Sequence, residues 1–316
     1  MSGHGVLVAG SANLDFVVRA DHVPAPGETV LGRDFATFPG GKGANQAIAS
    51  ARAGGAPTRM LVALGNDAYA TTLESALGAA GVALEIVRCT DRPTGTAFIC
   101  LDDDAENAIT VAPGANDALL PAHLPSLDGV RFVLMQLETP IETVAAYASA
   151  ARAAGVSVAP NAAPARTLPK ALLDDLDLLI VNEGELASLA GVEGSIIEQL
   201  QRLPVPIVVV TLGALGCCVH SSQGLLLQPA FPVRPVDTTG AGDTFCGTLV
   251  AQLAQGAVLT VALRAASAAS AIACTRLGAQ SGIPTRMEVD ALLAGRADSG
   301  PSALAGLATA CGASLP

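Results

Sequence analysis

The chain has 316 residues, a formal net charge of −11 and 51% hydrophobic residues. Its apolar runs are short and are interrupted by glycine, proline or charge, which excludes a membrane span, and it lacks the basic stripes of a nucleic-acid-binding protein. The N-terminus has no signal-peptide pattern, so we expect a cytoplasmic protein, and the spacing of the seven cysteines and four histidines favours reduced thiols over a zinc site.

Residues 6–9 form the first predicted strand, and the sequence GSANLD follows it. On an extended segment, Asn13 and Asp15 point to the same side because successive side chains alternate. Two polar groups on one face are candidates for binding hydroxyls, and the alternative is a turn closed by an Asx hydrogen bond. Further on, Thr, Val and Phe in loose alternation over residues 29–38 favour an edge strand.

The sequence PGGKGANQA then leads into a helix predicted at about 44–53. Its glycines, among them Gly41, put Lys42 and Asn45 at the amino end of that helix. The pattern GxxxxGK followed by Ser or Thr is missing, so this is not a phosphate-binding P-loop. The chain has only two lysines, and a compact ammonium at a glycine-lined helix start is a candidate ligand for hydroxyls or an anion. The alternative is a solvated lysine.

Residues 94–112 predict a hairpin, with strands at 97–101 and 108–112 and an acidic turn at 102–106. Together with residues 13–18 and 29–38, these strands could form a small separate sheet. We expect that sheet to be a flap over the hydroxyl-binding side chains and to form the contact of a homodimer.

The rest of the chain alternates strand and helix, with apolar strands predicted at 130–134, 156–159, 178–181 and 207–210. Each ends in a polar or glycine-containing loop, as in a doubly wound parallel sheet, where ligands bind at the carboxyl ends of the strands. One cleft could therefore collect the polar and glycine residues at these positions, which are Glu138, Asn182, Glu185, Thr211, Gly213 and Asp243.

The sequence VDTTGAGDTFCG, residues 236–247, opens the longest predicted helix, at about 243–275. Gly240 and Gly242 let the backbone turn sharply, so that consecutive N–H groups can converge on an anion at the helix start. Asp243 would face that anion, which suggests a general base for a hydroxyl that attacks a phosphoryl group. The alternative is an N-cap aspartate on a glycine-rich turn. Beyond Gly295 we expect a short surface helix or a disordered tail.

These motifs give the chain a family resemblance. The sequences PGGKGANQAIASARAGG and VDTTGAGDTFCGTL, with GSANLD, PAPGET, PGAND, QLETP, NAAPAR and TRLGAQ, resemble the ribokinase or PfkB family of sugar kinases from Val6 to about Leu293. The resemblance implies an α/β fold with a doubly wound, mostly parallel sheet flanked by helices and a small β-sheet lid. It divides the chain into a core (1–12, 39–93 and 113–296), a lid (13–38 and 94–112) and a tail (297–316).

The resemblance also implies an activity and a site: transfer of a phosphoryl group from ATP to the primary hydroxyl of D-ribose. Asp243 matches the base, and the backbone of Gly240, Ala241 and Gly242 matches the anion hole. The implied sugar ligands are Asn13, Asp15, Gly41, Lys42, Asn45 and Glu138. ATP would lie along Asn182, Thr211, Gly213, Gly216, Gly242 and Ser267, with Glu185 acting on Mg²⁺ through water. A potassium ion would be held by Asp237, Thr239, Ala273, Arg276 and Gly278.

Two positions depart from the family pattern. Gly282 stands where a serine often contributes to the potassium site, with Ser281 one place early, and Ser267 stands where His or Asn is common near the adenine. The alternatives within the family are a kinase of 2-deoxyribose, another pentose or a nucleoside, and outside catalysis a silent sugar-binding regulator. A nicotinamide-dependent oxidoreductase is disfavoured because GxGxxG does not follow the first strand, where Gly10 precedes SANLD.

Overall fold

The computed structural model describes residues 4–102, 107–295 and 300–313. The acidic turn expected at 102–106 therefore lies outside the described residues, apart from Asp102. Within the described ranges, no helix combines the length and the apolar character that crossing a membrane would need.

The main sheet is mostly parallel, as the sequence predicts, and it consists of two segments. The first has the order β5-β4-β1-β8-β9 and the second the order β10-β11-β12-β13, in which β12 and β13 form an antiparallel hairpin. An isolated bridge between Asn161 and Ile180 joins the two segments. The strands are β1 (Gly5–Ala9), β4 (Thr58–Leu64), β5 (Ala83–Arg88), β8 (Val130–Met135), β9 (Ser157–Pro160), β10 (Leu178–Asn182), β11 (Ile207–Thr211), β12 (Gly216–Ser221) and β13 (Gly224–Pro229).

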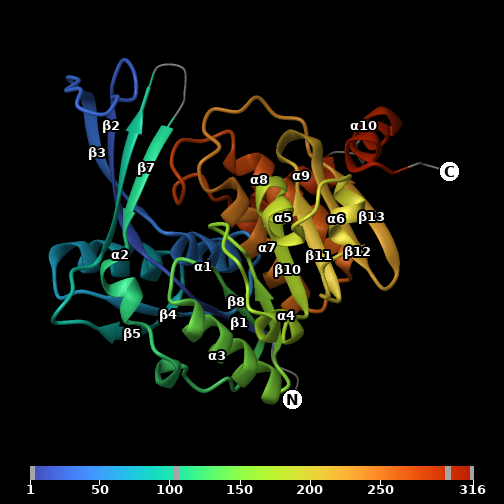
Figure 1. Cartoon of the computed structure of the whole chain (residues 1–316), viewed down its shortest axis with the longest axis horizontal. Helices are drawn as coiled ribbons and strands as arrows, with labels where there is room; N and C mark the ends of the chain where they lie inside the picture. Colours follow the sequence, from blue (N-terminus) through green and yellow to red (C-terminus); the bar gives the residue numbers. More distant parts are fainter. Residues whose placement is uncertain (1–3, 103–106, 296–299, 314–316) are drawn as a thin grey trace.

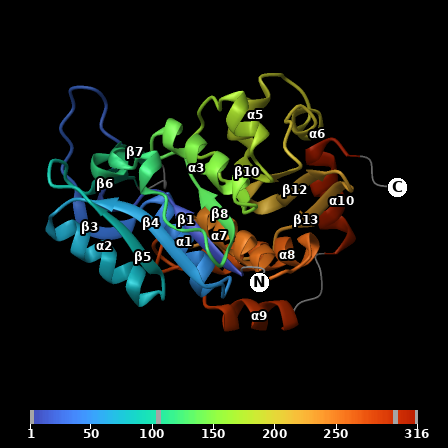
Figure 2. The same cartoon turned by 90° about the horizontal axis from the view of Figure 1, so that it is seen from below.

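Two apolar cores cover the two faces of this sheet, because alternate side chains of a strand point to opposite sides. Val6 and Val8 of β1 belong to one core, and Leu7 and Ala9 belong to the other. Figures 1 and 2 show the helices on both faces. The first core is covered by α1 (Lys42–Arg52), α2 (Ala68–Ala79), α7 (Ala241–Ala254), α8 (Leu259–Ala273) and α9 (Arg286–Gly295); the second by α3 (Ile141–Ala153), α4 (Lys170–Asp174), α5 (Glu183–Ala190), α6 (Ile196–Leu200) and α10 (Pro301–Cys311).

The long helix predicted at 243–275 is wrong in one respect, since the segment forms two helices, α7 and α8. The chain turns between them at Gly256, whose φ of +88° lies in the left-handed region that favours glycine. The tail forms the helix α10, which packs on β12 and β13. Its Leu307 and Cys311 are fully buried.

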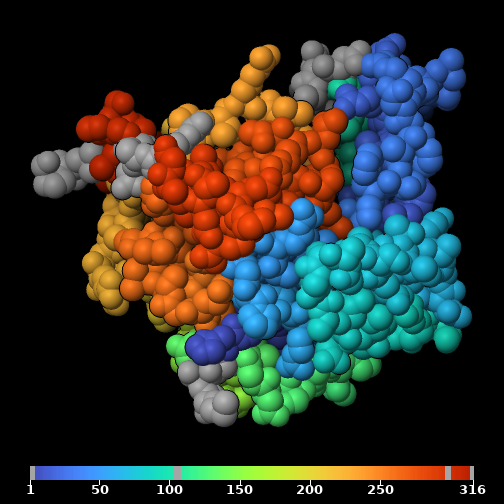
Figure 3. Space-filling view, turned by 180° about the vertical axis from the view of Figure 1, so that it is seen from behind, coloured from blue at the N-terminus to red at the C-terminus, as the bar shows by residue number. Residues whose placement is uncertain are grey.

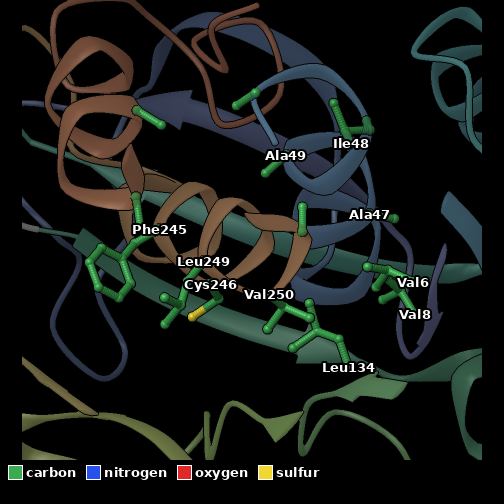
Figure 4. Packing of buried hydrophobic residues seen from close by; sticks show 14 of the residues in the cluster. Val6, Val8, Ala47, Ile48, Ala49, Leu134, Phe245, Cys246, Leu249 and Val250 are labelled. Carbon is green, nitrogen blue, oxygen red and sulfur yellow. The ribbon is translucent and has the colours of Figure 1, made fainter. Parts of the chain in front are cut away.

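Helices α1 and α7 cross with their backbones in contact. A Cβ at Gly247 would lie 2.3 Å from the carbonyl oxygen of Gln46, and one at Gly54 would lie 2.2 Å from the Cβ of Ala251. Figure 4 shows the apolar side chains packed around this crossing, among them Leu249 and Val250 of α7. The crossing brings the amino end of α1 next to the first turn of α7.

A third, mixed sheet with the order β3-β2-β6-β7 projects from this body (Figure 1). Its strands are β2 (Asn13–Arg19), β3 (Arg33–Gly40), β6 (Gly95–Leu101) and β7 (Asn107–Ala112). The hairpin and its pairing with residues 13–18 agree with the sequence, whereas the strand expected at 29–38 begins only at Arg33 and runs to Gly40. We call this sheet the lid.

The C-terminal helices close the back of the molecule. Figure 3 shows the orange-red segment that includes α9 beside the blue segment of α1. There Arg286 Nη1 donates to the carbonyl oxygen of Gly54 at 3.0 Å. Residues far apart in the sequence therefore fix the position of α1, which carries part of the site.

Candidate active site

The carboxylate of Asp243 lies in the first turn of α7 and is only 8% exposed. Its Oδ2 accepts a hydrogen bond of 2.9 Å from Nδ2 of Asn45, and its Oδ1 accepts one of 2.9 Å from Nε2 of Gln46. Both donors belong to α1, so the helix crossing supplies one amide to each oxygen. Gln280 in turn donates to Oδ1 of Asn45 at 3.1 Å, which fixes the orientation of the Asn45 amide.

The backbone before Asp243 forms the turn that the glycines predict. Gly240 is the N-cap of α7 with φ +74°, and a Cβ there would lie 3.0 Å from the Cα of Ala279. The N–H of Ala241 is already used, since it donates to the carbonyl oxygen of Thr238 at 3.2 Å. Within the described residues, the N–H groups of Gly240 and Gly242 donate to no acceptor, so they remain for an anion.

Three carboxylates and one ammonium gather at the amino end of α1. The charge of Asp243 raises the pKa of Lys42 against the opposing effect of burial, and Glu138 adds to it. Burial raises the pKa of Asp15 to about 7, with further contributions from the charges of Glu138 and Asp243. Glu138 Oε2 accepts from the hydroxyl of Ser11 at 2.5 Å and from the N–H of Lys42 at 3.1 Å. This group of side chains can accept hydrogen bonds from several hydroxyls of one ligand.

Asn13 reaches the same region because Asn116 holds it. Nδ2 of Asn116 donates to Oδ1 of Asn13 at 2.7 Å, and Oδ1 of Asn116 accepts from the N–H of Ala12 at 3.0 Å. Gly41 allows α1 to start here, since its φ is +90° and a Cβ would lie 2.7 Å from the backbone N of Asn13. Five of the six residues predicted to bind a sugar therefore lie where β1 leads into β2 and α1 begins, and Glu138, in the loop after β8, reaches them through its hydrogen bonds to Ser11 and Lys42.

Two cavities meet beside Asp243. The smaller, of about 140 Å³, is lined by Lys42, Asn182, Glu185, Thr211, Gly240, Gly242 and Asp243, among others. The larger, of about 560 Å³, is lined by apolar residues such as Phe231 and by Thr211, Gly213, Gly216, Gly242 and Ser267. Because Thr211 and Gly242 line both, the two cavities are neighbours. The residues predicted to contact ATP divide between them, with Asn182 and Glu185 on the side of Asp243.

Asn182 and Glu185 form a capping box at the start of α5. Oδ1 of Asn182 accepts from the N–H of Glu185 at 2.8 Å, and Oε2 of Glu185 accepts from the N–H of Asn182 at 2.8 Å. Burial raises the pKa of Glu185, although the hydrogen bond from Asn182 opposes this. The cap occupies one oxygen of Glu185, and the other makes no hydrogen bond to the described residues.

The loop predicted to hold potassium closes on Asp237. Burial opposes ionisation of this carboxyl, but hydrogen bonding by the Thr239 side chain and by the N–H groups of Gly278 and Thr239, at 2.8 and 2.9 Å, outweighs it and lowers its pKa. A Cβ at Gly282 would lie 2.8 Å from the carbonyl oxygen of Gly278, 3.2 Å from that of Ala273 and 3.7 Å from that of Arg276. Three carbonyl oxygens thus converge on the space beside Gly282, and such hard oxygen donors fit an alkali cation.

Several polar side chains of the site were not singled out from the sequence: Ser11, Gln46, Asn116, Gln136, Asn161 and Gln280. All six lie in stretches that carry the family resemblance, and each is nine-tenths or more buried. A buried amide or hydroxyl needs a partner, so polar residues inside otherwise apolar, alanine-rich segments were a usable signal. Which partner each one finds depends on contacts across the fold.

Comparison with known proteins bears on this geometry. The family described as pfkB family carbohydrate kinase matches residues 4–286. The ribokinase of Bacillus subtilis is 41% identical over 293 residues, which cover 91% of this chain and 99% of that protein. The deoxyribokinase of Salmonella typhi is 30% identical over 295 residues, covering 89% and 95% respectively. The solved structure of Arabidopsis thaliana ribokinase complexed with ribose and ATP is 34% identical, with a TM-score of 0.84 over 93% of this chain and 99% of that one.

Proposed function

The chain belongs to the pfkB family of carbohydrate kinases, and from this premise we propose that it phosphorylates the primary (O5) hydroxyl of D-ribose to give ribose 5-phosphate. It is a ribokinase-type phosphotransferase that uses ATP and an alcohol group of a sugar. The choice of ribose rests on the relatives, since the ribokinase from Bacillus subtilis is 41% identical and the deoxyribokinase from Salmonella typhi is 30% identical.

One observation carries the mechanism: Asp243 lines the smaller cavity where that cavity adjoins the larger one. In our proposal, ribose occupies the side of Asp15, Lys42 and Glu138, and ATP occupies the larger cavity with its phosphates directed to Gly242. Asp243 takes the proton of O5 while this oxygen forms a bond to the γ-phosphorus, and the bond from the γ-phosphorus to the bridging oxygen of ADP breaks. A positioned base contributes roughly 10²- to 10⁴-fold in rate.

The sugar would be held by charge as well as shape. Deprotonated Asp15 and the oxygens of Glu138 accept hydrogen bonds from sugar hydroxyls, and the Lys42 ammonium and the amide nitrogen of Asn13 donate to neighbouring hydroxyls. Since Lys42 has its pKa raised by Asp243, it stays protonated and balances the carboxylates around the sugar. Asn45, whose amide is engaged by Asp243 and Gln280, would contact the sugar only with its remaining N–H.

The part of the site that would bind ATP combines backbone N–H groups with metal ions. The N–H groups of Gly240 and Gly242 would receive the transferred phosphoryl oxygens, which carry developing charge. Mg²⁺, when bound, neutralises phosphate charge, and Glu185 would hold it through water. Asp237 and the carbonyl groups of Thr239, Ala273, Arg276 and Gly278 would hold potassium next to this turn, where a cation strengthens the binding of an anion.

An ATP-dependent sugar kinase of this kind works in the cytoplasm, as the sequence suggests.

The lid supports the proposed homodimer. Its side chains Ile109 and Val111 are 54% and 40% exposed, whereas Phe98 lies on the opposite face of the lid, stacked on Phe16. By strand register, Ile109 pairs with Ile99 and Ile99 with Val17, so Ile109 shares a face with Asp15. A second copy that covers this face would bury apolar surface and close the sugar side of the site at the same time.

The proposal is tested by ADP release from MgATP with ribose, 2-deoxyribose, fructose or adenosine, each with and without potassium. Preference for ribose in kcat/KM supports it, because loss of one hydrogen-bonded hydroxyl costs a buried partner its hydrogen bond. Preference for another sugar moves the substrate within the family. No turnover with any sugar, combined with sugar binding in calorimetry, identifies a silent sugar-binding regulator instead.

A further inference from the structure

We propose that Gln46 is a positioning residue for phosphoryl transfer: its amide donates to the Asp243 carboxylate and keeps it turned toward the acceptor hydroxyl. The proposal rests on the role of Asp243 as the base. Gln46 is fully buried on α1 and is not among the residues that line the cavity beside Asp243, so it acts through Asp243 and not on a ligand.

All hydrogen-bonding capacity of the Gln46 amide nitrogen is used. Nε2 donates to Oδ1 of Asp243 at 2.9 Å and to Oδ1 of Asn161 at 3.0 Å, while Oε1 accepts from Nε2 of Gln136 at 2.6 Å. A flipped amide would set its oxygen against two acceptors and its nitrogen against a donor. The orientation of Gln46, and with it the donor offered to Asp243, is therefore fixed.

Both anchors of Gln46 belong to the main sheet. Gln136 follows β8 directly and Asn161 follows β9, which are neighbouring parallel strands. Nδ2 of Asn161 also donates to the carbonyl oxygen of Ile180 in β10, at the bridge between the two sheet segments. Gln136, Asn161 and Gln46, which we call the relay, thus tie the base on α7 to the ends of β8 and β9, whereas the other donor, Asn45, is tied to the loop that carries Gln280.

The N-terminal motif makes room for this relay. A Cβ at Gly10 would lie 2.0 Å from Oε1 of Gln136, so any larger residue would displace that side chain. Gly10 lies between β1 and β2 and is followed by the sequence SANLD. The glycine therefore has a role in the site although it lines neither of the two cavities.

The physical effect is on the charged form of the base. Burial and nearby like charges favour proton uptake by any carboxylate. A hydrogen bond from an amide to the ionised form opposes this uptake and fixes which lone pair faces the sugar. Without Gln46, turnover should fall and the acidic limb of the kcat profile should move to higher pH.

The experiment compares Gln46→Met, which keeps the length of the side chain and removes the amide, with Gln252→Met. Gln252 is also a buried glutamine, and its Nε2 donates to the carbonyl oxygen of Gly54 at 2.8 Å, outside the relay. We expect Gln46→Met to lower kcat at neutral pH by roughly 10- to 100-fold, the factor of one hydrogen bond to a charged group, with KM for the sugar within about threefold. Higher pH should restore part of this loss, and Gln252→Met should keep the wild-type profile.

An unchanged pH profile in Gln46→Met, or an equal fall of kcat in Gln252→Met, overturns the proposal because both indicate a purely structural role. If Gln46→Met does not fold, Gln136→Met and Gly10→Ala test the same relay one step away and should shift the profile in the same direction. Asp243→Asn distinguishes failure of the proposed function from failure of this inference. Near-normal turnover of Asp243→Asn would show that Asp243 is not the base. If Asp243→Asn is inactive and Gln46→Met behaves as wild type, only the role of Gln46 is overturned.

Discussion

Gly247 on α7 lies directly against Gln46 on α1, so closely that a Cβ on the glycine would stand 2.3 Å from the carbonyl oxygen of Gln46. Asp243 is one turn before Gly247 and shares its helix face. Backbone contact at Gly247 therefore carries Asn45 and Gln46 to within hydrogen-bond distance of the two oxygens of Asp243. The proposed base is therefore in position because Gly247, four residues further on, has no side chain that would hold the two helices apart.

We expect Gly247→Ala to destabilise the protein and to lower activity in the fraction that folds. The added methyl meets backbone atoms and the Cβ of Ala49, which cannot move aside like a flexible side chain, and overpacking typically costs about 1–3 kcal/mol. Gly78→Ala on α2 is the matched control, since nothing lies within 4 Å of its Cβ and alanine stabilises a helix by roughly 0.5–1 kcal/mol. Urea unfolding of both variants measures the difference; equal stability would contradict the close crossing.

Asp243→Asn should retain sugar binding and lose most of kcat, because the amide cannot take the proton of the attacking hydroxyl. We expect a fall of roughly 10²- to 10⁴-fold in ADP release, with the sugar dissociation constant measured by calorimetry. The exposed Asp128 offers a control in Asp128→Asn, which should behave as wild type. Near-normal turnover of Asp243→Asn would rule out this residue as the base.

The sugar affinity should depend on pH through Asp15, whose pKa is raised from 3.8 to about 7 by burial and by two neighbouring carboxylates. Above that pH the ionised carboxylate accepts hydroxyl hydrogen bonds, so KM for the sugar should fall as the pH rises from about 6 to about 8. Asp15→Asn should abolish this dependence. An unchanged pH dependence in the variant would assign it to another group.

The same shift has a consequence for stability. Between pH 3.8, the pKa expected for Asp15 in the unfolded chain, and about 7, the folded chain holds a proton that the unfolded chain has released. The free energy of unfolding contributed by Asp15 therefore falls as the pH rises through this window. As the pH rises toward neutral, the free energy of unfolding measured in urea should fall less for Asp15→Asn than for the wild type. If the two curves of this free energy against pH are parallel, the pKa of Asp15 is not raised in the folded chain.

Potassium activation should depend on the space beside Gly282. In Gly282→Ala the new methyl would press on the carbonyl oxygens of Gly278 and Ala273, so the loop must open or exclude the ion. We expect loss of stimulation by KCl in ADP release, with activity in the absence of potassium retained. Gly295→Ala, where nothing lies within 4 Å of the Cβ, is the control. Full stimulation in Gly282→Ala would show that the cation binds elsewhere.

The lid contact can be tested separately from chemistry. Ile109→Asp puts a charge on an apolar side chain that is 54% exposed, whereas Met287→Asp does the same on α9, where the methionine is 79% exposed. In sedimentation at micromolar concentration, we expect Ile109→Asp to be monomeric and Met287→Asp to remain a dimer. A monomeric wild-type protein would contradict the proposed dimer.

Much of the fold followed from local patterns. Continuous apolar runs such as that of β11 predict buried parallel strands, and alternation in the hairpin of β6 and β7 predicts the lid sheet. The break between α7 and α8 was missed because Gly256 lies in an apolar, alanine-rich segment that is helical on either side. A single glycine is tolerated within a helix, so only its left-handed backbone in the folded chain reveals the turn.

The sequence by itself determined the family, the glycine turn before Asp243 and the amide at Asn45, because motif spacing and helix starts are local properties. The tertiary structure alone decided that Gln46 joins Asn45 on Asp243, that Gln136 and Asn161 hold Gln46, and that three carbonyl groups converge on Gly282. The contacts around Asp243 join residues that are 90 to 198 positions apart in the chain. The periodicity of a sequence gives no information about contacts over such separations. Close packing of glycine-lined backbones brings them together.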